Sequence, residues 1–386
     1  MASELKLRVL LAGGGSGGHI YPLVAVAKKI REKMGPSGLN VELRYFGEPG
    51  VYADYLIGND IPVTRIASSK WRRYFSVQNY LDMFKLVFGF CQALVKVFFY
   101  MPDVVFSKGG PGVLPIIFAT RFYRIPLVIH ESDAVPGLSN SISARKADTV
   151  EVAFEEAKPY FSRNQVVNVV GNPVRSSLII SESRATSRAS LGMIDELPLI
   201  LILGGSQGAQ QINTFILENA HDLLTNFEIV HQVGRDNFIQ YQREFEFMSK
   251  TLDPRLKERY LAVPFLDDKK LAIALNASDV IVSRSGSAIW EIAAAGKPAV
   301  LIPLADSANN HQLENAYAYA KTGAAVVIEE GNLLVNLLVG QITKMLGSEV
   351  TYQMMVKAAK NFYRQDSADK IAADVIAVSG ALKVSY

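Results

Sequence analysis

Two glycine-rich stretches carry the residues best suited to bind a phosphate. The first, AGGGSGGH, covers residues 12–19 and places Gly13, Gly15 and Gly18 in a G-x-G-x-x-G spacing. The second, GGSQG, covers residues 204–208. Because glycine has no Cβ, the backbone N–H groups of such a turn can approach a phosphate closely, and a following helix adds positive potential. Each stretch therefore predicts a phosphate-binding turn.

A histidine, His19, follows the last glycine of the first stretch. At the N-terminus of a helix the dipole favours neutral imidazole, and a neutral imidazole can act as a general base. A histidine that only hydrogen-bonds the glycine loop is the competing interpretation. The stretch IHESDAVPGLSN, residues 129–140, offers Glu131 or Asp133 as an alternative base.

A serine- and glycine-rich turn in the second half of the chain, SRSGS at residues 283–287, precedes Glu291 by about one helical turn. Its hydroxyl and N–H groups can hold a phosphate, and a carboxylate at Glu291 can accept hydrogen bonds from both hydroxyls of a ribose. The alternative for Glu291 is an acid stabilised by the helix N-terminus alone. The next polar stretch, NNHQLENA, provides amides that suit sugar hydroxyls, because an amide both donates and accepts. Its candidate residues are His311, Gln312, Glu314 and Asn315.

Arg175 is placed to face an anionic leaving group, although a surface arginine is the simpler interpretation. The chain has no D-x-D sequence, and its histidines, carboxylates and single Cys91 do not fall at metal-ligand spacing. We therefore expect no metal and no cofactor. Helix dipoles and Arg175 would then stabilise a leaving diphosphate.

Strands and helices alternate along the chain, and this alternation is typical of parallel sheets covered by helices on both faces. An apolar strand, a glycine turn and a helix occur at residues 7–35 and again at 197–220. We therefore predict two doubly wound domains, 1–175 and 176–350, with a helical segment, 351–386, that packs back on the N-terminal domain. Ligands of such sheets bind beyond the carboxyl ends of the strands, and we expect the site in a cleft between the domains.

Composition limits the function classes. The 386 residues are 49 % hydrophobic and carry a net charge of only +3, so nothing indicates nucleic-acid binding. The apolar N-terminal run is short and ends in glycines, which predicts a first strand and not a signal peptide. A dinucleotide-dependent oxidoreductase would need an acidic residue about 20 positions after the glycines. Glu48 lies further from Gly18 than that, and such an enzyme would leave the second glycine loop unexplained.

The most apolar region, residues 81–101, contains Asp82, Lys85 and Lys96. These charges favour a buried or surface-docked amphipathic helix over a membrane-spanning one. Just upstream, KWRRYF at residues 70–75 combines basic and aromatic side chains, which suits a lipid headgroup surface. An ordinary solvated loop is the alternative.

Seven segments in order give the chain a recognisable resemblance. They are GGGSGGHIYP, SKGGPG, HESDAVPGLSN, GNPVR, LGGSQGAQQIN, SRSGSAIWEIAAAGKP and HQLENA. With these, the chain resembles the MurG family of bacterial glycosyltransferases over about residues 7–345. The resemblance implies an α/β GT-B fold, in which two Rossmann-like, doubly wound domains face each other across a cleft.

The resemblance also implies a reaction. Members of the family are hexosyltransferases that move N-acetylglucosamine from UDP-GlcNAc to the 4-hydroxyl of the muramyl sugar of lipid I, the undecaprenyl-diphosphate-linked muramyl peptide. The transfer inverts the anomeric centre, needs no metal, and yields lipid II and UDP for peptidoglycan synthesis at the cytoplasmic face of the cell membrane. The rivals are another GT-B UDP-sugar enzyme, including a UDP-GlcNAc 2-epimerase, and a non-catalytic nucleotide-sugar binding protein.

The site residues implied by the resemblance fall into three groups. The catalytic residues are His19 and Glu131. The donor-binding residues are Ser16, Gly17, Gly18, Arg175, Ser206, Gln207, Leu266, Ser287, Glu291, His311 and Gln312. The acceptor-binding residues are Gly109, Gly110, Asp133 and Asn140.

Overall fold

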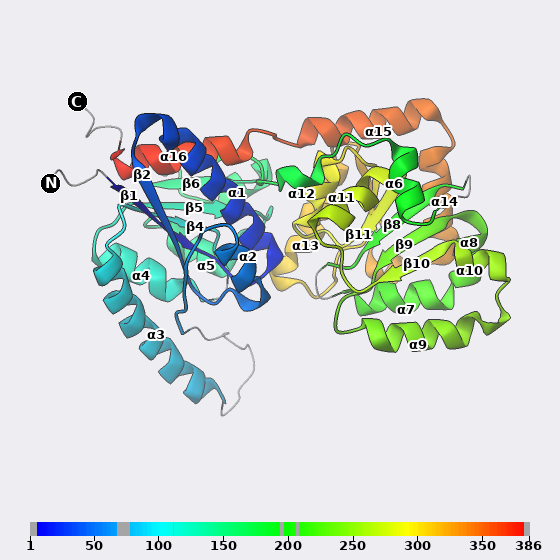
Figure 1. Ribbon diagram of the computed structural model, residues 1–386, viewed down its shortest axis with the longest axis horizontal. Coiled ribbons are helices and arrows are strands. Elements are labelled where there is room, and N and C mark those ends of the chain that lie inside the picture. Colours follow the sequence, from blue (N-terminus) through cyan, green and yellow to red (C-terminus); the bar gives the residue numbers. More distant parts are fainter. Residues whose placement is uncertain (1–5, 68–77, 111, 194–196, 206–207, 382–386) are drawn as a thin grey trace. The chain divides into compact units, whose positions relative to one another are not determined.

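The computed structural model describes residues 6–67, 78–110, 112–193, 197–205 and 208–381. The chain divides into two compact units (Figure 1). Unit 1 comprises Met1–Val174 and Arg364–Tyr386, and unit 2 comprises Arg175–Tyr363. The basic stretch at residues 70–75 lies outside the described residues, so its proposed role at a membrane stays a prediction.

Unit 1 is built on a parallel sheet of seven strands in the order β3-β2-β1-β4-β5-β6-β7. The strands are β1 (Lys6–Ala12), β2 (Asn40–Phe46), β3 (Val63–Thr64), β4 (Val104–Ser107), β5 (Leu127–Glu131), β6 (Thr149–Val152) and β7 (Val167–Val169). The strand order reverses between β1 and β4. In doubly wound sheets the loops at the carboxyl ends of the strands diverge at this switch point, where ligands bind.

Helices cover both faces of this sheet (Figure 1). On one face, α1 (Gly17–Met34) and α16 (Ser367–Ser379) pack against β1, β2 and β4. On the other face, α3 (Gln78–Tyr100) and α4 (Leu114–Phe122) pack against the central strands. The shorter helices are α2 (Ala53–Ile57) and α5 (Leu138–Ala144). Helix α1 ends at Met34, immediately before Gly35, as the sequence predicted.

One buried carboxyl group helps to dock α16 on the sheet. Glu151 of β6 is completely buried and accepts a 3.1 Å hydrogen bond from Asn168, whose amide also donates to Asp374 of α16. Burial and the neighbouring Asp374 raise the pKa of Glu151 from its ordinary value of 4.5 to about 8. The folded protein therefore holds a proton on this side chain that the unfolded chain releases at lower pH.

Replacing Glu151 with glutamine should flatten the pH dependence of stability. A carboxyl whose folded pKa is raised contributes stability that is complete below its unfolded pKa and is lost as the pH rises through its folded pKa. Wild type should therefore lose stability relative to Glu151→Gln between about pH 4.5 and pH 8. Urea midpoints at pH 5, 7 and 9 measure this difference, and wild-type and variant curves that stay parallel would contradict it.

Unit 2 contains a second parallel sheet, of six strands in the order β10-β9-β8-β11-β12-β13. The strands are β8 (Leu199–Leu203), β9 (Glu228–Gln232), β10 (Tyr260–Val263), β11 (Val280–Ser283), β12 (Ala299–Leu301) and β13 (Ala325–Val327). Its switch point lies between β8 and β11. The glycine turn after β8 and the serine turn after β11 therefore begin side by side, because β8 and β11 are hydrogen-bonded neighbours.

Ten α-helices of unit 2 lie in the described residues. They are α6 (Arg184–Ser190), α7 (Gln210–Glu218), α8 (Ala220–Asn226), α9 (Phe238–Met248), α10 (Pro254–Glu258), α11 (Asp268–Ala277), α12 (Ala288–Ala294), α13 (His311–Ala320), α14 (Val335–Leu346) and α15 (Glu349–Phe362). The ring of Phe362 stacks on Trp290 of α12 at 4.5 Å, which holds α15 in unit 2. The structure thus divides the segment 351–386, which we expected on the N-terminal domain, because only α16 packs in unit 1.

The prediction of two doubly wound α/β domains is confirmed by the two parallel sheets. The apolar segment at residues 81–101 forms most of α3, and its described side chains are amphipathic. Ala93 and Val97 are buried, whereas Phe88 and Phe99 are exposed. Among the helices in the described part of the chain, none has an apolar run long enough to cross a membrane.

Candidate active site

The glycine loops of unit 1 meet at the switch point of its sheet. The N–H of Gly14, after β1, donates a 2.9 Å hydrogen bond to the carbonyl of Gly109, after β4. A Cβ on Gly15 would lie 2.7 Å from the carbonyl oxygen of Glu48, and one on Gly110 (φ +95°) would lie 2.9 Å from the backbone of Gly14. The glycines are therefore required for the close approach of these loops, besides any approach to phosphate.

The imidazole of His19 lies between these loops, in the first turn of α1. Its Nδ1 lies 2.7 Å from Ser16 Oγ. A Cβ on Gly14 or Gly110 would come within 3.0 Å of a ring nitrogen. Burial and the positive charge of Lys108 lower the pKa of His19 to about 4. The ring is neutral near pH 7, as expected, but burial and Lys108 are the causes, whereas the sequence analysis had assigned this effect to the helix dipole.

Glu131 lies at the end of β5 and organises the loop that follows. Its carboxylate accepts hydrogen bonds from the N–H groups of Asp133 (2.9 Å) and Gly137 (3.1 Å) and from Asn140 Nδ2 (2.9 Å). The side chain is almost completely buried, and burial together with Asp133 raises its pKa. Both oxygens of Glu131 are thus engaged, which favours a structural role for this carboxylate.

Asn140, in the first turn of α5, also lies against the β4 loop. A Cβ on Gly109 (φ +71°) would overlap its amide group, so only glycine fits there. The Oδ1 of Asn140 is buried and has no hydrogen-bond partner within the described ranges. The structure therefore brings Gly109, Gly110, Glu131 and Asn140 together with His19 at one edge of the unit 1 sheet.

A buried lysine in this region was missed by the sequence analysis. Lys108 Nζ lies 2.6 Å from His130 Nδ1 and 2.9 Å from Asn172 Oδ1. Both SKGGPG and GNPVR were noted as motifs, but their glycines and arginine were taken as the functional residues. The available signal was a lysine directly after a short strand that is apolar except for its last residue, Ser107.

In unit 2, Arg175 joins two carboxylates. Its Nη1 lies 2.5 Å from Asp268 Oδ1, and its Nη2 lies 2.6 Å from Glu291 Oε1. The arginine side chain is 6 % exposed, whereas that of Glu291 is 20 % exposed and can still be reached from solvent. The guanidinium thus orients Glu291 at the start of α12, a role that the sequence analysis did not foresee.

The turn after β8 is held by a glutamine that the sequence analysis also missed. Gln232, at the end of β9, donates a 2.9 Å hydrogen bond to the carbonyl of Gly205 and accepts one of 2.9 Å from the N–H of Leu266. Leu266 is buried. This amide fixes the position of Leu266 relative to the glycine turn. The predicted donor residues Ser206 and Gln207 lie outside the described residues.

The serine turn after β11 is connected to the start of α13. Ser285 donates to the carbonyl of Gln312 (2.6 Å), and Asn315 donates to the carbonyl of Ser285 (3.1 Å). Ser287 immediately precedes α12, and His311 begins α13. The structure therefore brings Ser287, Gln312 and His311 to the same edge of the unit 2 sheet as Glu291. No group of three or more potential metal-ligating side chains occurs in the portion of the chain that is described.

Comparison with known protein families identifies the family to which the chain belongs. Residues 9–152 match the N-terminal domain of glycosyltransferase family 28, and residues 199–371 match its C-terminal domain. The chain belongs to glycosyltransferase family 28.

Two relatives that match most of the chain indicate which enzyme of the family it resembles. A protein of Clostridium kluyveri is 33 % identical over 369 residues, which cover 94 % of this chain and 97 % of the relative. A protein of Treponema denticola is 36 % identical over 334 residues, which cover 83 % of each. Both are named UDP-N-acetylglucosamine–N-acetylmuramyl-(pentapeptide) pyrophosphoryl-undecaprenol N-acetylglucosamine transferase.

A solved structure supports the same assignment. The crystal structure of Acinetobacter baumannii MurG is 26 % identical, with a TM-score of 0.69, and the similarity covers 96 % of this chain and 99 % of that one. The two doubly wound units of this chain are those of the GT-B fold, which confirms the predicted fold class.

Proposed function

We propose that this protein transfers N-acetylglucosamine from UDP-GlcNAc to the 4-hydroxyl of the muramyl sugar of lipid I, with inversion and without a metal, and so forms lipid II and UDP. The observation that carries the proposal is the neutral His19 at the crossing of the glycine loops. It occurs in a chain whose relatives, named as this transferase, match nearly its full length.

His19 is the general base of this mechanism. If its Nδ1–H donates to Ser16 Oγ, 2.7 Å away, Nε2 is left to accept a proton. The acceptor hydroxyl gives its proton to Nε2 while its oxygen attacks C1 of N-acetylglucosamine. The bond between C1 and the diphosphate oxygen breaks, and UDP leaves with the electron pair. A single displacement inverts C1 and needs no covalent intermediate.

Glu131 acts by positioning, since its oxygens hold the loop that follows β5. In this proposal Gly109, Gly110, Asp133 and Asn140 contact the acceptor. The unpartnered Oδ1 of Asn140 supports this assignment, because a buried amide oxygen without a partner is costly unless a ligand or water supplies one.

The donor binds to unit 2 in this proposal. Glu291, oriented by Arg175, accepts hydrogen bonds from the ribose hydroxyls, and Leu266 lines the uracil pocket. His311 and Gln312 contact the N-acetylglucosamine. The diphosphate contacts are assigned to Ser16, Gly17, Gly18, Ser206, Gln207 and Ser287. With no metal, backbone N–H groups and helix N-termini would stabilise the leaving diphosphate.

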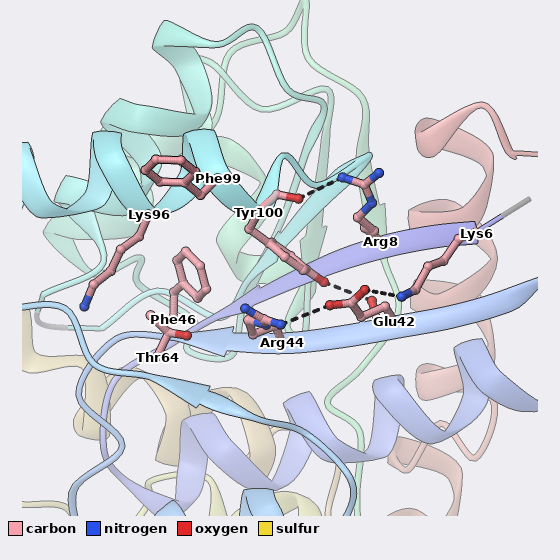
Figure 2. A pocket seen from close by; sticks show the side chains of 9 residues that line it. All are labelled: Lys6, Arg8, Glu42, Arg44, Phe46, Thr64, Lys96, Phe99 and Tyr100. Atoms are coloured by element: carbon pink, nitrogen blue, oxygen red, sulfur yellow. Dashed lines mark hydrogen bonds and ion pairs between the residues drawn. The ribbon is translucent and has the colours of Figure 1, made fainter. Parts of the chain in front are cut away.

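We also assign peripheral binding at the cytoplasmic face of the cell membrane to α3. Exposed Phe88 and Phe99 lie on this helix. Beside Phe99 is a hollow of about 440 Å³ lined by four basic side chains and one acidic side chain (Figure 2). Its lining residues are Lys6, Arg8, Glu42, Arg44, Phe46, Thr64, Lys96, Phe99 and Tyr100. Basic charge beside exposed aromatic rings suits an anionic lipid surface.

Most ionised side chains of this hollow pair with one another on the sheet, and Arg8 attaches the end of α3. Glu42 of β2 pairs with Lys6 (2.5 Å) and with Arg44 (3.2 Å), as Figure 2 shows. Arg8 donates to the carbonyl of Tyr100, at the end of α3 (3.0 Å). The bond from Arg8 thus anchors the C-terminal end of the helix that carries Phe88 and Phe99.

Replacing Phe88 and Phe99 together with serine should weaken binding to anionic vesicles by at least about tenfold, because each phenylalanine contributes apolar surface to the interface. Co-sedimentation with vesicles of anionic phospholipid measures the effect. Phe247→Ser is the matched control, since Phe247 is 70 % exposed on α9 in unit 2. Equal binding by the double variant and by the control would exclude α3 as the membrane contact.

The reaction itself is tested against its rivals by leaving out the acceptor. With UDP-GlcNAc and a lipid I analogue, the protein should release UDP, and without the analogue it should release almost none. A 2-epimerase would form UDP-N-acetylmannosamine from UDP-GlcNAc alone. A binding protein would bind UDP-GlcNAc and form neither product.

A further inference from the structure

The side chain of Tyr52 lies against the first residue of α1. Tyr52 ends a 3₁₀ helix, Gly50–Tyr52, in the loop after β2, and it is only 8 % exposed. Its hydroxyl oxygen lies 2.9 Å from the position that a Cβ on Gly17 would occupy. Its ring packs edge-on against Tyr21 of α1, with the ring centroids 5.5 Å apart. The phenol hydroxyl is thus fixed beside the N-terminus of this helix.

This hydroxyl makes no hydrogen bond to another residue in the described part of the chain. A buried tyrosine hydroxyl usually finds a partner, because leaving it without one costs free energy. The loop that carries it packs directly on the glycine turn, since a Cβ on Gly50 (φ +58°) would lie 3.0 Å from the carbonyl oxygen of Gly15. A water or a bound molecule at the glycine turn must therefore supply the partner.

The N-terminus of α1 also lacks the groups that usually satisfy a helix start. Its N-cap residue, Ser16, makes no side-chain cap hydrogen bond, and the first turn contains no acidic side chain. The Ser16 hydroxyl lies against His19 instead. The backbone N–H groups of Gly17 and Gly18 have no partner within the described ranges. Unsatisfied N–H groups and the dipole of an 18-residue helix together favour an anion at this position.

The loop after β2 brings no unpaired negative charge to this position. Between Gly47 and Tyr52 the acidic residue is Glu48. Its carboxylate pairs with Arg65 Nη1 at 3.0 Å, and both side chains are exposed to solvent. The guanidinium and the solvent therefore screen the carboxylate from an anion bound beside Gly17.

We propose that Tyr52 is a further substrate-binding residue, whose hydroxyl donates a hydrogen bond to a phosphate oxygen of a diphosphate held at the N-terminus of α1. This inference rests on the proposed function, which assigns Gly17 and Gly18 to a diphosphate but uses no side chain from the loop after β2. A phosphate oxygen only accepts, and a tyrosine hydroxyl can donate to it. UDP-GlcNAc and lipid I both carry a diphosphate, so the experiment has one arm for each.

Tyr52→Phe removes the hydroxyl and keeps the ring that packs on Tyr21. It should raise the KM of the substrate whose diphosphate binds here by about tenfold, since a hydrogen bond to a charged group is lost. A higher KM for UDP-GlcNAc assigns the hydroxyl to the donor, and a higher KM for the lipid I analogue assigns it to the acceptor. Tyr160→Phe is the matched control, because Tyr160 is 60 % exposed in unit 1, and it should change neither KM.

Titration calorimetry provides a readout that does not depend on transfer. The probes are UDP and farnesyl diphosphate, a lipid-linked diphosphate without a sugar. Tyr52→Phe should bind one of the two probes about tenfold more weakly than wild type. Its melting temperature should stay within a few degrees of the wild-type value, because the ring contact is retained.

Unchanged KM values for both substrates, together with unchanged affinities for both probes, would overturn the inference. So would a lower melting temperature with no change in KM or affinity, since the hydroxyl would then serve the fold alone. A wild-type protein that transfers no N-acetylglucosamine would instead refute the proposed function. The titrations with UDP and farnesyl diphosphate would still decide whether Tyr52 binds a diphosphate.

Discussion

Replacing His19 with alanine should lower the turnover number for N-acetylglucosamine transfer by roughly 10²–10⁴-fold, the usual contribution of a positioned general base. The physical reason is the state of the ring. Burial and Lys108 keep the imidazole neutral at pH 7, and the Ser16 hydroxyl, 2.7 Å from Nδ1, orients it. Without the ring, the acceptor hydroxyl must lose its proton to water.

Steady-state kinetics with saturating donor measures this effect. The matched control is His221→Ala, because the side chain of His221 is 71 % exposed on α8 in unit 2. Ser16→Ala should have a smaller effect than His19→Ala, since it removes only the orienting hydroxyl. A loss below tenfold for His19→Ala would assign the base to Glu131 or Asp133 instead.

Replacing Glu291 with alanine should raise the KM for UDP-GlcNAc by about 10- to 100-fold and leave kcat within a few fold. Hydrogen bonds to a charged group contribute about 1.5–3 kcal/mol each, and the ribose hydroxyls bind equally in the ground and transition states. Arg175, 2.6 Å away, orients this carboxylate.

Donor titrations on Glu291→Ala and on Glu246→Ala, an exposed glutamate on α9, separate binding from a general charge effect. Arg175→Met should raise the same KM, because it leaves Glu291 without its orienting partner. It should also lower stability, since two carboxylates lose a buried counter-ion. An unchanged donor KM in Glu291→Ala would show that Glu291 does not bind the donor and is only an acid stabilised by the N-terminus of α12.

The two doubly wound domains were predictable because strands buried on both faces are apolar throughout. Strand β8, with the sequence LILIL, is buried along its whole length and leads directly into a glycine turn. The carboxyl end of such a strand is where ligands bind, so the positions of His19 and Glu291 next to strand ends could also be foreseen.

Contacts between residues far apart in the chain could not be foreseen. Lys108 meets His130, 22 residues later, and Asn172, 64 residues later, and no spacing rule connects them. The orienting pair of Arg175 and Glu291 is separated by 116 residues. These pairs depend on how the strands are ordered in each sheet, which periodicity does not reveal.

The packing of the C-terminal helices could not be predicted from the sequence either. Both α15 and α16 are amphipathic, and the sequence does not say which core each helix covers. Stacking of Phe362 on Trp290 assigns α15 to unit 2, whereas Ile371 and Val375 place α16 in the core of unit 1. Tertiary packing, not local propensity, decides between such alternatives.

The most direct test of the central claim follows radiolabel from UDP-GlcNAc into a short-chain lipid I analogue, with and without EDTA. The proposed mechanism predicts that a β-linked disaccharide forms on the lipid at the same rate with and without EDTA. The reason is that a neutral base accepts the proton and backbone N–H groups stabilise the leaving diphosphate. Label that stays in nucleotide sugar, or transfer that stops when EDTA is added, would contradict it.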